Sequence, residues 1–374
     1  MLTTIIESRT YKIVSNRIIF KKHFYIYKME NNVYNFKVNI DWKLIGVISQ
    51  IDRFDASWAS IEKKEGQSLK QLKSIATVRS VGASTRIEGS KMSDEEVNIL
   101  IQKLDITKLE DRDSQEVVGY FNAFDIISES FSDIDISESS IKNLHNILMK
   151  HSEKDEWHKG NYKQHSNAVE ANFPDGTKQI VFKTTEAGFP TEDAMRALIN
   201  WYNNDSITHP LVKCSLFTYE FLSIHPFQDG NGRLSRLISS LLLLKNGYNW
   251  IQYVSFEHEI ENNKPEYYRV LRSCQSQRPN ENVSDWNLFF FDTLKKIQEQ
   301  LMLKLKHDGI EIQLSPREKS ILTFIENNVG CKSGEIAKKL GIPSPTIKRI
   351  LPVLIEKKLI EKHGIGPSTN YSIK

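Results

Sequence analysis

Apolar residues recur at helical spacing through most of the middle of the chain. Ser93 and Glu96 form a capping-box pattern ahead of an apolar stretch, and Ser137 opens another stretch of the same kind. Further helices are expected from Thr191 onward and over residues 211–224, where most turns carry an apolar residue. The pattern predicts a bundle of amphipathic helices.

One segment inside this helical region is typical of strands instead. Residues 172–176 read Asn-Phe-Pro-Asp-Gly, which is turn chemistry, and residues 180–185 are mostly β-branched or aromatic. Gly188 and Pro190 then end the strand pattern. The segment predicts a short β-hairpin, and because an isolated hairpin is marginally stable, we expect it to lean on the bundle.

The last 65 residues, 310–374, form a separable unit. One helix is expected to start at Ser315, and a second follows Ser333 and stops at Gly341. A third helix comes after this glycine, and residues 360–373 have the pattern of a small hairpin. Three helices followed by a hairpin predict a winged helix-turn-helix.

Composition and charge narrow the class of protein. The 374 residues include 50 Lys and Arg against 47 Asp and Glu, and 39% are hydrophobic, which excludes a disordered or fibrous chain. The length predicts two or three domains. The net charge is +3, but residues 310–374 hold eleven basic and six acidic side chains, so the basic charge is concentrated in the tail.

Neither a membrane span nor a secretion signal is expected. The sequence has no apolar run approaching about 18 residues, and charges interrupt every apolar stretch of residues 1–28. The three cysteines are far apart and none belongs to a Cys-x-x-Cys pair, which argues against a disulfide framework or a structural zinc site. We therefore expect a cytoplasmic protein.

The strongest chemical signal is in residues 225–236, which read His-Pro-Phe-Gln-Asp-Gly-Asn-Gly-Arg-Leu-Ser-Arg. Gly230 and Gly232 allow a tight turn directly before an apolar helix, and the free backbone N–H groups of such a helix start bind anions such as phosphates. Arg233 and Arg236 are three residues apart, so both guanidinium groups can reach the same polyphosphate.

Two other side chains of this segment add chemistry. Asp229 is a hard oxygen ligand of the type that Mg²⁺ uses when substrate phosphates share it, and His225 can act as a general base near neutral pH. Each feature alone is more often structural. Their combination within twelve residues favours a site that acts on a phosphate compound.

The segment resembles the Fic motif, His-x-Phe-x-Asp/Glu-Gly-Asn-Gly-Arg-x-x-Arg, with every fixed position met. The resemblance covers about residues 84–300, including residues 144–148, 159–162 and the pair Tyr267-Tyr268. Fic proteins are helical enzymes that mostly transfer AMP from Mg²⁺-ATP to a protein hydroxyl and release pyrophosphate. The resemblance therefore implies a mainly α fold, a Fic bundle with a hairpin flap, and protein adenylyltransferase activity.

The resemblance also implies a role for each matched residue. His225 would deprotonate the incoming Ser, Thr or Tyr hydroxyl, Asp229 would hold Mg²⁺, and Phe227 would anchor the loop. ATP would be held by residues of the turn, the helix and a later aromatic pair: Gly230, Asn231, Gly232, Arg233, Arg236 and Tyr268. Within this set, Asn231 would contact the α-phosphate and Arg236 would contact the γ-phosphate. Tyr268 and its neighbour Tyr267 would pack against the nucleotide base.

A second element comes earlier in the chain. Residues 84–89, Ser-Thr-Arg-Ile-Glu-Gly, resemble the inhibitory helix of the Fic class that carries its inhibitor in the same chain. Glu88 would pair with Arg236 and deny this arginine to the γ-phosphate. The alternative is a surface helix that ends at Gly89 and leaves Glu88 in solvent.

These observations predict a three-part chain. Residues 41–112 would form a helical region with the inhibitory helix, residues 113–300 the Fic domain, and residues 310–374 the winged helix, while residues 1–40 stay unassigned. By resemblance, the flap around residues 178–188 would hold a target segment as an added strand.

Other functions stay open on the sequence. The Fic core could sense nucleotide in a DNA-binding regulator, Glu88 could orient a water that removes AMP, and some relatives transfer phosphate or phosphocholine. The sequence names neither the target protein nor the oligomeric state, and a homodimer stays open.

The tail could bind DNA or dock a protein. Four side chains begin or line its candidate recognition helix: Ser344, Thr346, Lys348 and Arg349. Pro343 and Pro345 are expected to shorten this helix, which favours docking.

Overall fold

The computed structural model describes residues 36–64, 66–103, 109, 111–172, 178–311, 315–356, 359–364 and 366–373. The expectations for residues 1–28 therefore lie outside the described residues, as do most of the predicted hairpin turn and residue 374.

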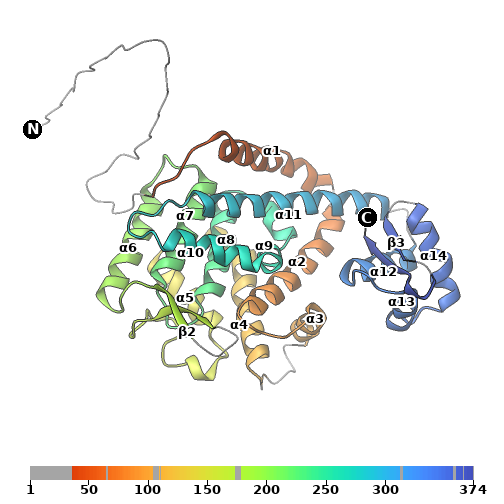
Figure 1. Ribbon diagram of the computed structural model, residues 1–374, viewed down its shortest axis with the longest axis horizontal. Helices are drawn as coiled ribbons and strands as arrows, with labels where there is room; N and C mark the ends of the chain where they lie inside the picture. Colours follow the sequence, from red (N-terminus) through yellow and green to blue (C-terminus); the bar gives the residue numbers. More distant parts are fainter. Residues whose placement is uncertain are drawn as a thin grey trace, which may run out of the picture.

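The main body is a bundle of helices (Figure 1). They are α1 (Trp42–Lys64), α2 (Gly66–Ile87), α3 (Asp94–Gln102), α4 (Arg112–Ser130), α5 (Glu138–Leu148), α6 (Phe189–Asn204), α7 (Pro210–Ile224), α8 (Asn231–Lys245), α9 (Phe256–Asn262), α10 (Lys264–Gln275) and α11 (Ser284–Glu311). Short 3₁₀ turns at Phe131–Asp133, Glu153–Asp155 and Asn249–Tyr253 complete the body.

The centre of the bundle is the pair α7 and α8, which pack against each other. Nearly every residue of both helices is buried, as expected for helices that are apolar on most sides. The longest helix, α11, packs against α1, α7, α9 and α10. Figure 1 shows α11 running across the bundle toward the C-terminal lobe. The predicted helical bundle is confirmed. The His225–Arg236 motif begins directly after α7 and continues into α8.

The start signals of several helices are confirmed. The Ser93 side chain caps α3 in a capping box with Glu96, and Ser137 caps α5. The helix expected from Thr191 begins two residues earlier, at Phe189. Pro190 lies in its first turn, where the missing N–H would have no intrahelical partner. This proline therefore ends the hairpin region and starts α6.

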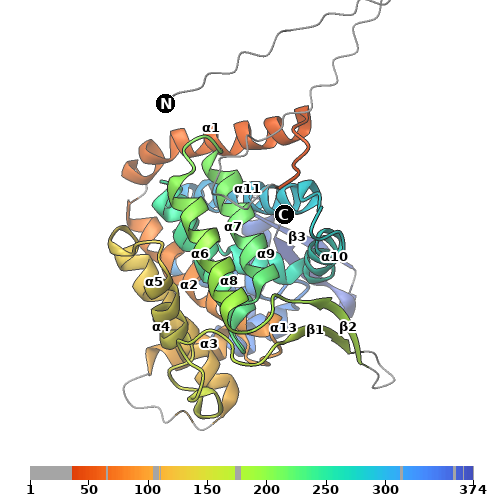
Figure 2. The same cartoon turned by 90° about the vertical axis from the view of Figure 1, so that its left-hand side faces the viewer.

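The predicted hairpin consists of β1 (Ala168–Asn172) and β2 (Lys178–Lys183), paired antiparallel with Ala168 opposite Lys183 and a register shift between residues 169 and 170. Figure 2 shows the two strands projecting from the side of the bundle. β2 contacts α10, so the hairpin leans on the helices as expected.

The C-terminal lobe contains α12 (Pro316–Asn327), α13 (Ser333–Leu340), α14 (Ser344–Glu356), β3 (Ile360–His363) and β4 (Asn370–Ile373). It has its own apolar core, separate from that of the bundle. Ser315 caps α12 in a capping box, and Gly341 ends α13 with φ 63°. The winged-helix architecture of three helices and a hairpin is confirmed.

Two details of α14 differ from expectation. The helix already includes Ser344, so Pro345 does not shorten it: the proline lies in the first turn, where it breaks no hydrogen bond. Pro352 lies inside the same helix and was not singled out from the sequence.

Polar contacts join the lobe to the bundle. Arg79 Nη2 of α2 donates to Asn327 Oδ1 at the end of α12 at 2.7 Å, and Lys304 of α11 lies 3.9 Å from Glu326. Among the described residues, none of the helices has both the length and the apolar character needed to cross a membrane.

Candidate active site

The His225–Arg236 segment consists of the turn between α7 and α8, residues 225–230, and the start of α8, residues 231–236. His225 follows the last residue of α7 in a left-handed conformation, with φ 54° and ψ 60°. It is the one non-glycine residue with positive φ in the described part of the chain. Gly230 precedes α8 with φ 80°. These two left-handed residues reverse the chain, and a side chain at position 230 would be strained.

His225 is set up as a neutral base. Its Nδ1 lies 3.4 Å from the carbonyl oxygen of Leu222, and donation of a proton to this carbonyl leaves Nε2 free to accept one. Burial, and then the positive charge of Lys163, lower the pKa of His225 to about 4. The imidazole is therefore unprotonated at neutral pH.

Asn231 and Phe227 hold the turn in shape. Asn231 is buried; its Oδ1 accepts from the Phe227 backbone N–H at 2.9 Å and its Nδ2 donates to the Phe227 carbonyl at 2.8 Å. The Phe227 ring is fully buried and stacks on the ring of His145, with the centroids 3.8 Å apart. The Asn231 side chain is thus occupied within the loop, which leaves its backbone N–H as the group that can face a phosphate.

His145 of α5 contacts the same turn through one of its ring nitrogens. Its Nδ1 accepts from the Gly160 backbone N–H at 2.9 Å, so its Nε2 donates to the Asp229 carbonyl at 3.0 Å. Burial lowers the pKa of His145 to about 4, which keeps this ring neutral as well. The sequence resemblance included His145 but gave it no role.

Arg233 is a buried cation with free donors. Its side chain is 2% exposed, and its Nε and Nη1 have no hydrogen-bond partner. Glu116 of α4 lies 3.3 Å from Nη1, and Asp229 lies 3.6 Å from Nη2. Buried guanidinium donors are normally satisfied, so Arg233 together with the N–H groups of the first turn of α8 forms a site suited to an anion.

Arg236 lies one turn further along α8 and is already paired. Its Nη2 donates to Glu88 Oε1 at 2.7 Å and to the Ser84 carbonyl at 2.9 Å, and its Nε donates to Ser84 Oγ at 2.8 Å. The Glu88 charge is the largest factor that raises the pKa of Arg236, against the effect of burial. A β-carbon at Gly232 would overlap the Glu88 carboxylate. A glycine at position 232 therefore gives the Glu88 carboxylate room beside Arg236.

Asp229 has the chemistry of a metal ligand shared with a substrate. Its side chain is 41% exposed; Oδ1 accepts from the Gly230 N–H at 2.6 Å, and Oδ2 lies 3.6 Å from Lys154 Nζ. The positive charge of Arg233 and the Gly230 hydrogen bond keep its pKa below the ordinary value in spite of burial. Within the described residues, no cluster of three or more His, Cys, Asp or Glu side chains could cage a metal. A single exposed carboxylate fits Mg²⁺ of the kind that takes its other ligands from phosphates and water.

The site residues predicted from the sequence line one cavity of about 200 Å³. His225, Asp229 and Arg233 lie along it with Glu88, Tyr267 and Tyr268. Five further lining residues were not predicted: Leu222, Gln228, Leu271, Arg272 and Gln275. Tyr267 packs on Trp286 and is also part of the core, while Arg272 lies over the Tyr268 ring at 5.4 Å. The cavity is smaller than the roughly 300–1,000 Å³ of most ligand sites, and Glu88 forms part of its wall.

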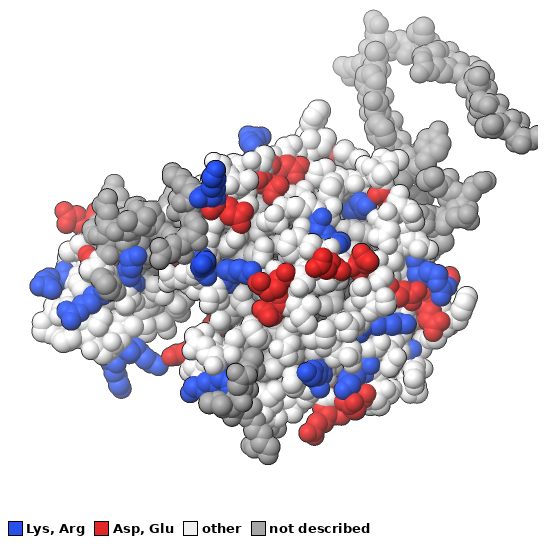
Figure 3. Space-filling view, turned by 180° about the vertical axis from the view of Figure 1, so that it is seen from behind, with Lys and Arg blue, Asp and Glu red and all other residues white. Residues whose placement is uncertain are grey.

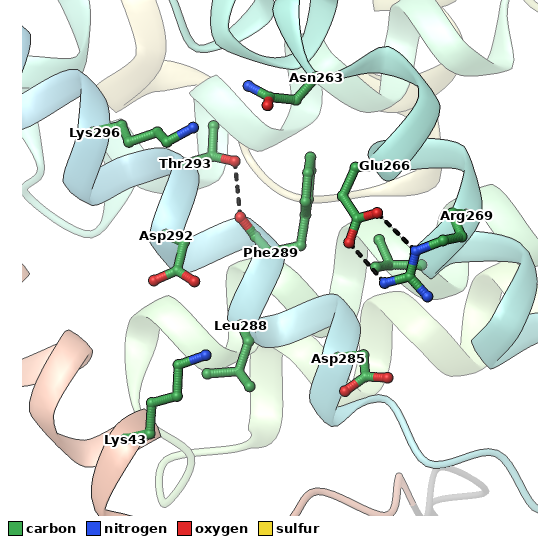
Figure 4. Close-up of a pocket in the computed structure, with 11 residues that line it drawn as sticks. Lys43, Asn263, Glu266, Arg269, Asp285, Leu288, Phe289, Asp292, Thr293 and Lys296 are labelled. Carbon is green, nitrogen blue, oxygen red and sulfur yellow. Dashed lines mark hydrogen bonds and ion pairs between the residues drawn. The ribbon is translucent and has the colours of Figure 1, made fainter.

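A larger cavity of about 360 Å³ lies between α1, α10 and α11, away from the motif (Figure 4). Its walls carry charges of both signs, and Glu266 and Arg269 pair with each other across two hydrogen bonds of 2.7 and 2.6 Å. This cavity contains none of the base, turn and arginine groups described above.

Two parts of the chain are similar to known protein families. Residues 135–243 match the Fic/DOC family, and residues 312–365 match the MarR family. The protein adenylyltransferase Fic of Drosophila melanogaster is 26% identical over 205 residues, which are 54% of this chain and 39% of that protein. A probable protein adenylyltransferase of Aquifex aeolicus is 29% identical over 143 residues, 36% of this chain and 45% of that protein. The chain thus spans less than half the length of these relatives.

Solved structures share the fold. A Fic family protein from Desulfovibrio desulfuricans superimposes with a TM-score of 0.61 at 22% identity, over 91% of this chain and 98% of that one. A Fic domain containing signaling protein from Bacteroides thetaiotaomicron gives 0.53 at 22% identity, over 68% of this chain and 94% of that one. The chain is therefore similar to the Fic/DOC family over residues 135–243 and to the MarR family over residues 312–365, and it shares the fold of solved Fic structures.

Proposed function

We propose that this protein is an adenylyltransferase that moves AMP from Mg²⁺-ATP to a Ser, Thr or Tyr hydroxyl of a target protein and of itself, and that Glu88 restrains this activity. The observation that carries the proposal is the buried Arg233, whose Nε and Nη1 make no hydrogen bond and which lines one cavity with the neutral base His225 and the Asp229 carboxylate. The resemblance of the chain to named adenylyltransferases supports the same reaction.

His225 would act on the incoming hydroxyl. Its Nε2 takes the hydroxyl proton while the oxygen attacks the α-phosphorus of ATP, and the bond to the bridging oxygen of pyrophosphate breaks. The hydroxyl oxygen thus becomes bonded to AMP, pyrophosphate leaves, and the proton stays on the imidazole until solvent removes it. The low pKa of His225 keeps the ring unprotonated before the reaction.

The first turn of α8 would hold the phosphates. Arg233 and the backbone N–H groups of residues 231–233 would provide donors for an anion at this helix start. Asp229 would hold Mg²⁺, which when bound supplies positive charge that offsets the phosphate charge. Arg236 would reach the γ-phosphate once its ion pair with Glu88 is broken. Tyr268 and Tyr267 would pack against the nucleotide base.

Glu88 would inhibit adenylyl transfer by pairing with Arg236, the residue that would otherwise bind the γ-phosphate. The carboxylate sits on Arg236 and forms part of the cavity wall. With Arg236 paired, ATP has one charged partner fewer and less room, so its α-phosphate cannot be presented to the hydroxyl in line.

The same site could also remove AMP from a modified protein if Glu88 changed its partner. If Glu88 turned from Arg236 toward a water, it could serve as the base that removes AMP from a modified hydroxyl. Glu88 is held on Arg236 in this structure, so we propose transfer as the main reaction.

The C-terminal lobe is proposed to bind DNA or to dock a protein. Lys348 and Arg349 of α14 are exposed, whereas Ile347 and Ile350 of the same helix are buried. Among the charged side chains on the visible face of this lobe, Figure 3 shows more basic than acidic ones. Exposed Lys and Arg on the second helix of a helix-turn-helix suit phosphate contacts. A cytoplasmic location is proposed from the three cysteines, which are free and buried.

Incubation with ATP labelled on either the α- or the γ-phosphate tests the reaction. Adenylyl transfer predicts that the α-label becomes covalently attached to protein and that the γ-label appears in pyrophosphate. Attachment of the γ-label would indicate phosphate transfer instead, and attachment of neither label by the Glu88→Gly variant would contradict the proposal.

A further inference from the structure

A buried lysine joins the hairpin to the residue proposed as the base. Lys163 lies just ahead of β1, and its side chain is 1% exposed. Its Nζ donates to the Ile224 carbonyl at 3.1 Å, to Thr184 Oγ1 at 2.8 Å and to Asn167 Oδ1 at 3.0 Å. Three acceptors match the three N–H bonds of an ammonium group. None of them is a carboxylate, so the charge of Lys163 is buried without a counter-ion among these partners.

The position of these acceptors explains why a cation is tolerated there. Ile224 is the last residue of α7, and its carbonyl belongs to the negative end of that helix. Burial lowers the pKa of Lys163 to about 8. The amine is therefore mostly protonated at neutral pH, although it lies deep in the protein.

The backbone on both sides of His225 is bound from the same place. The Lys163 backbone N–H donates to the Pro226 carbonyl at 2.8 Å, and the Lys163 side chain binds the Ile224 carbonyl. Asn167 Nδ2 donates to the Phe227 carbonyl at 3.0 Å. The left-handed conformation of His225 costs energy for a non-glycine residue, and these contacts are placed to hold it.

Two of the Lys163 partners, Asn167 and Thr184, lie at the base of the hairpin, where its strands begin and end. Asn167 immediately precedes β1 and Thr184 immediately follows β2. Thr184 Oγ1 lies 2.6 Å from Asn167 Oδ1 and 2.8 Å from the Asn167 carbonyl, so the two strand ends are tied together where Lys163 binds them. A shift of the hairpin would therefore move the partners that hold the backbone at His225.

We propose that Lys163 is a positioning residue that couples the seating of a target segment on the β1–β2 hairpin to the orientation of His225. This inference rests on the proposed adenylyl transfer and on the role of the hairpin as the target-binding flap. It predicts that loss of the Lys163 side chain slows the transfer step and leaves ATP binding intact, because Lys163 does not line the cavity.

The test uses the full chain with the Glu88→Gly substitution as parent and measures self-adenylylation against ATP concentration. Lys163→Met should lower the maximal rate by about 10- to 100-fold, a part of what a general base contributes, and should change the ATP concentration at half-maximal rate by less than about threefold. Lys163→Arg keeps the charge and donors and should restore most of the rate. Lys150→Met, which alters an exposed lysine of the bundle, is the matched control.

A second variant separates positioning from general damage to the fold. Thr184→Val removes the hairpin end of the contact and should also lower the maximal rate, and the double variant with Lys163→Met should lose less than the product of the two single effects. Rates equal to the control for Lys163→Met, or a folded Thr184→Val protein with the parent rate, would overturn the proposal. Failure of the parent itself to transfer AMP would instead contradict the proposed function.

Discussion

Glu88 Oε1 lies 2.7 Å from Arg236 Nη2, and the two residues are 148 positions apart in the sequence. Glu88 follows the last residue of α2, while Arg236 lies in the second turn of α8. Ser84 binds the same guanidinium group twice. The end of α2 therefore holds the arginine that would otherwise be available to a phosphate, and this contact is the basis of the proposed restraint.

Glu88→Gly is expected to increase self-adenylylation. A hydrogen bond to a charged group contributes about 1.5–3 kcal/mol, so its release should raise the rate by about 10- to 100-fold at ATP concentrations below saturation. Transfer of α-labelled phosphate measures the gain. The combination of Glu88→Gly with Arg236→Ala should show no gain, and a gain that persists in it would contradict inhibition through this pair.

His225→Ala is expected to remove transfer and to leave nucleotide binding nearly unchanged. A general base contributes about 10² to 10⁴ in rate, and His225 is not among the groups proposed to hold the phosphates. Calorimetric titration with a non-hydrolysable ATP analogue, beside the transfer assay, separates the two effects. Loss of binding together with transfer would assign His225 a structural role.

The pH dependence of kcat/KM should distinguish a buried base from an ordinary histidine. The folded protein lowers the pKa of His225 from its usual 6.5 to about 4, so the ring stays neutral as the pH falls from 7 toward 5. We expect kcat/KM of the Glu88→Gly protein to stay level over this range and to fall only near pH 4. A decline centred near pH 6.5 would show that the base is not held in the neutral form described here.

Asp229→Ala should abolish both the activity and its dependence on Mg²⁺. Asp229 is the exposed carboxylate beside Arg233, and removal of this ligand would leave the metal without its protein contact. The rate measured over a range of Mg²⁺ concentrations checks this expectation. An Asp229→Ala protein that still responds to Mg²⁺ as the parent does would place the metal elsewhere.

The exposed basic pair of α14 gives a prediction about DNA. If Lys348 and Arg349 neutralise phosphates, the logarithm of affinity of the full chain for duplex DNA should fall with the logarithm of salt concentration, by about 0.9 per contact. Replacement of both by Ala should reduce this slope by about 2. Binding absent at low salt, or a slope unchanged in the variant, would favour a protein-docking lobe.

The sequence could predict those parts of the site that are contiguous. The proposed base, the proposed metal ligand and both arginines lie within residues 225–236, where one turn and one helix fix their relative positions. Glu88 could be predicted because it lies inside a short pattern, residues 84–89, that resembles the inhibitory helix of the Fic family. The winged helix was predictable because Ser315 and Gly341 mark its helix ends.

The supporting residues could not be predicted in the same way. Lys163 and His145 are 62 and 80 positions before His225, and each acts on the turn through backbone carbonyls, which leave no trace in side-chain patterns. Glu116 follows a polar run at the start of α4, residues 112–115, and only the packing of α4 against α8 brings it to Arg233. For Asn231, the motif implied a role that its side chain does not have in this structure. The resemblance implied a contact with the α-phosphate, whereas the side-chain amide is hydrogen-bonded to the Phe227 backbone.

The most direct test of the account is the intact mass of the Glu88→Gly protein after incubation with Mg²⁺-ATP, measured beside the unaltered protein and the Glu88→Gly, His225→Ala double variant. Self-inhibited adenylyl transfer predicts a mass gain of one or more AMP groups in the Glu88→Gly protein, a smaller gain in the unaltered protein, and none in the double variant. An unchanged mass in all three, or equal gains with and without His225, would contradict it.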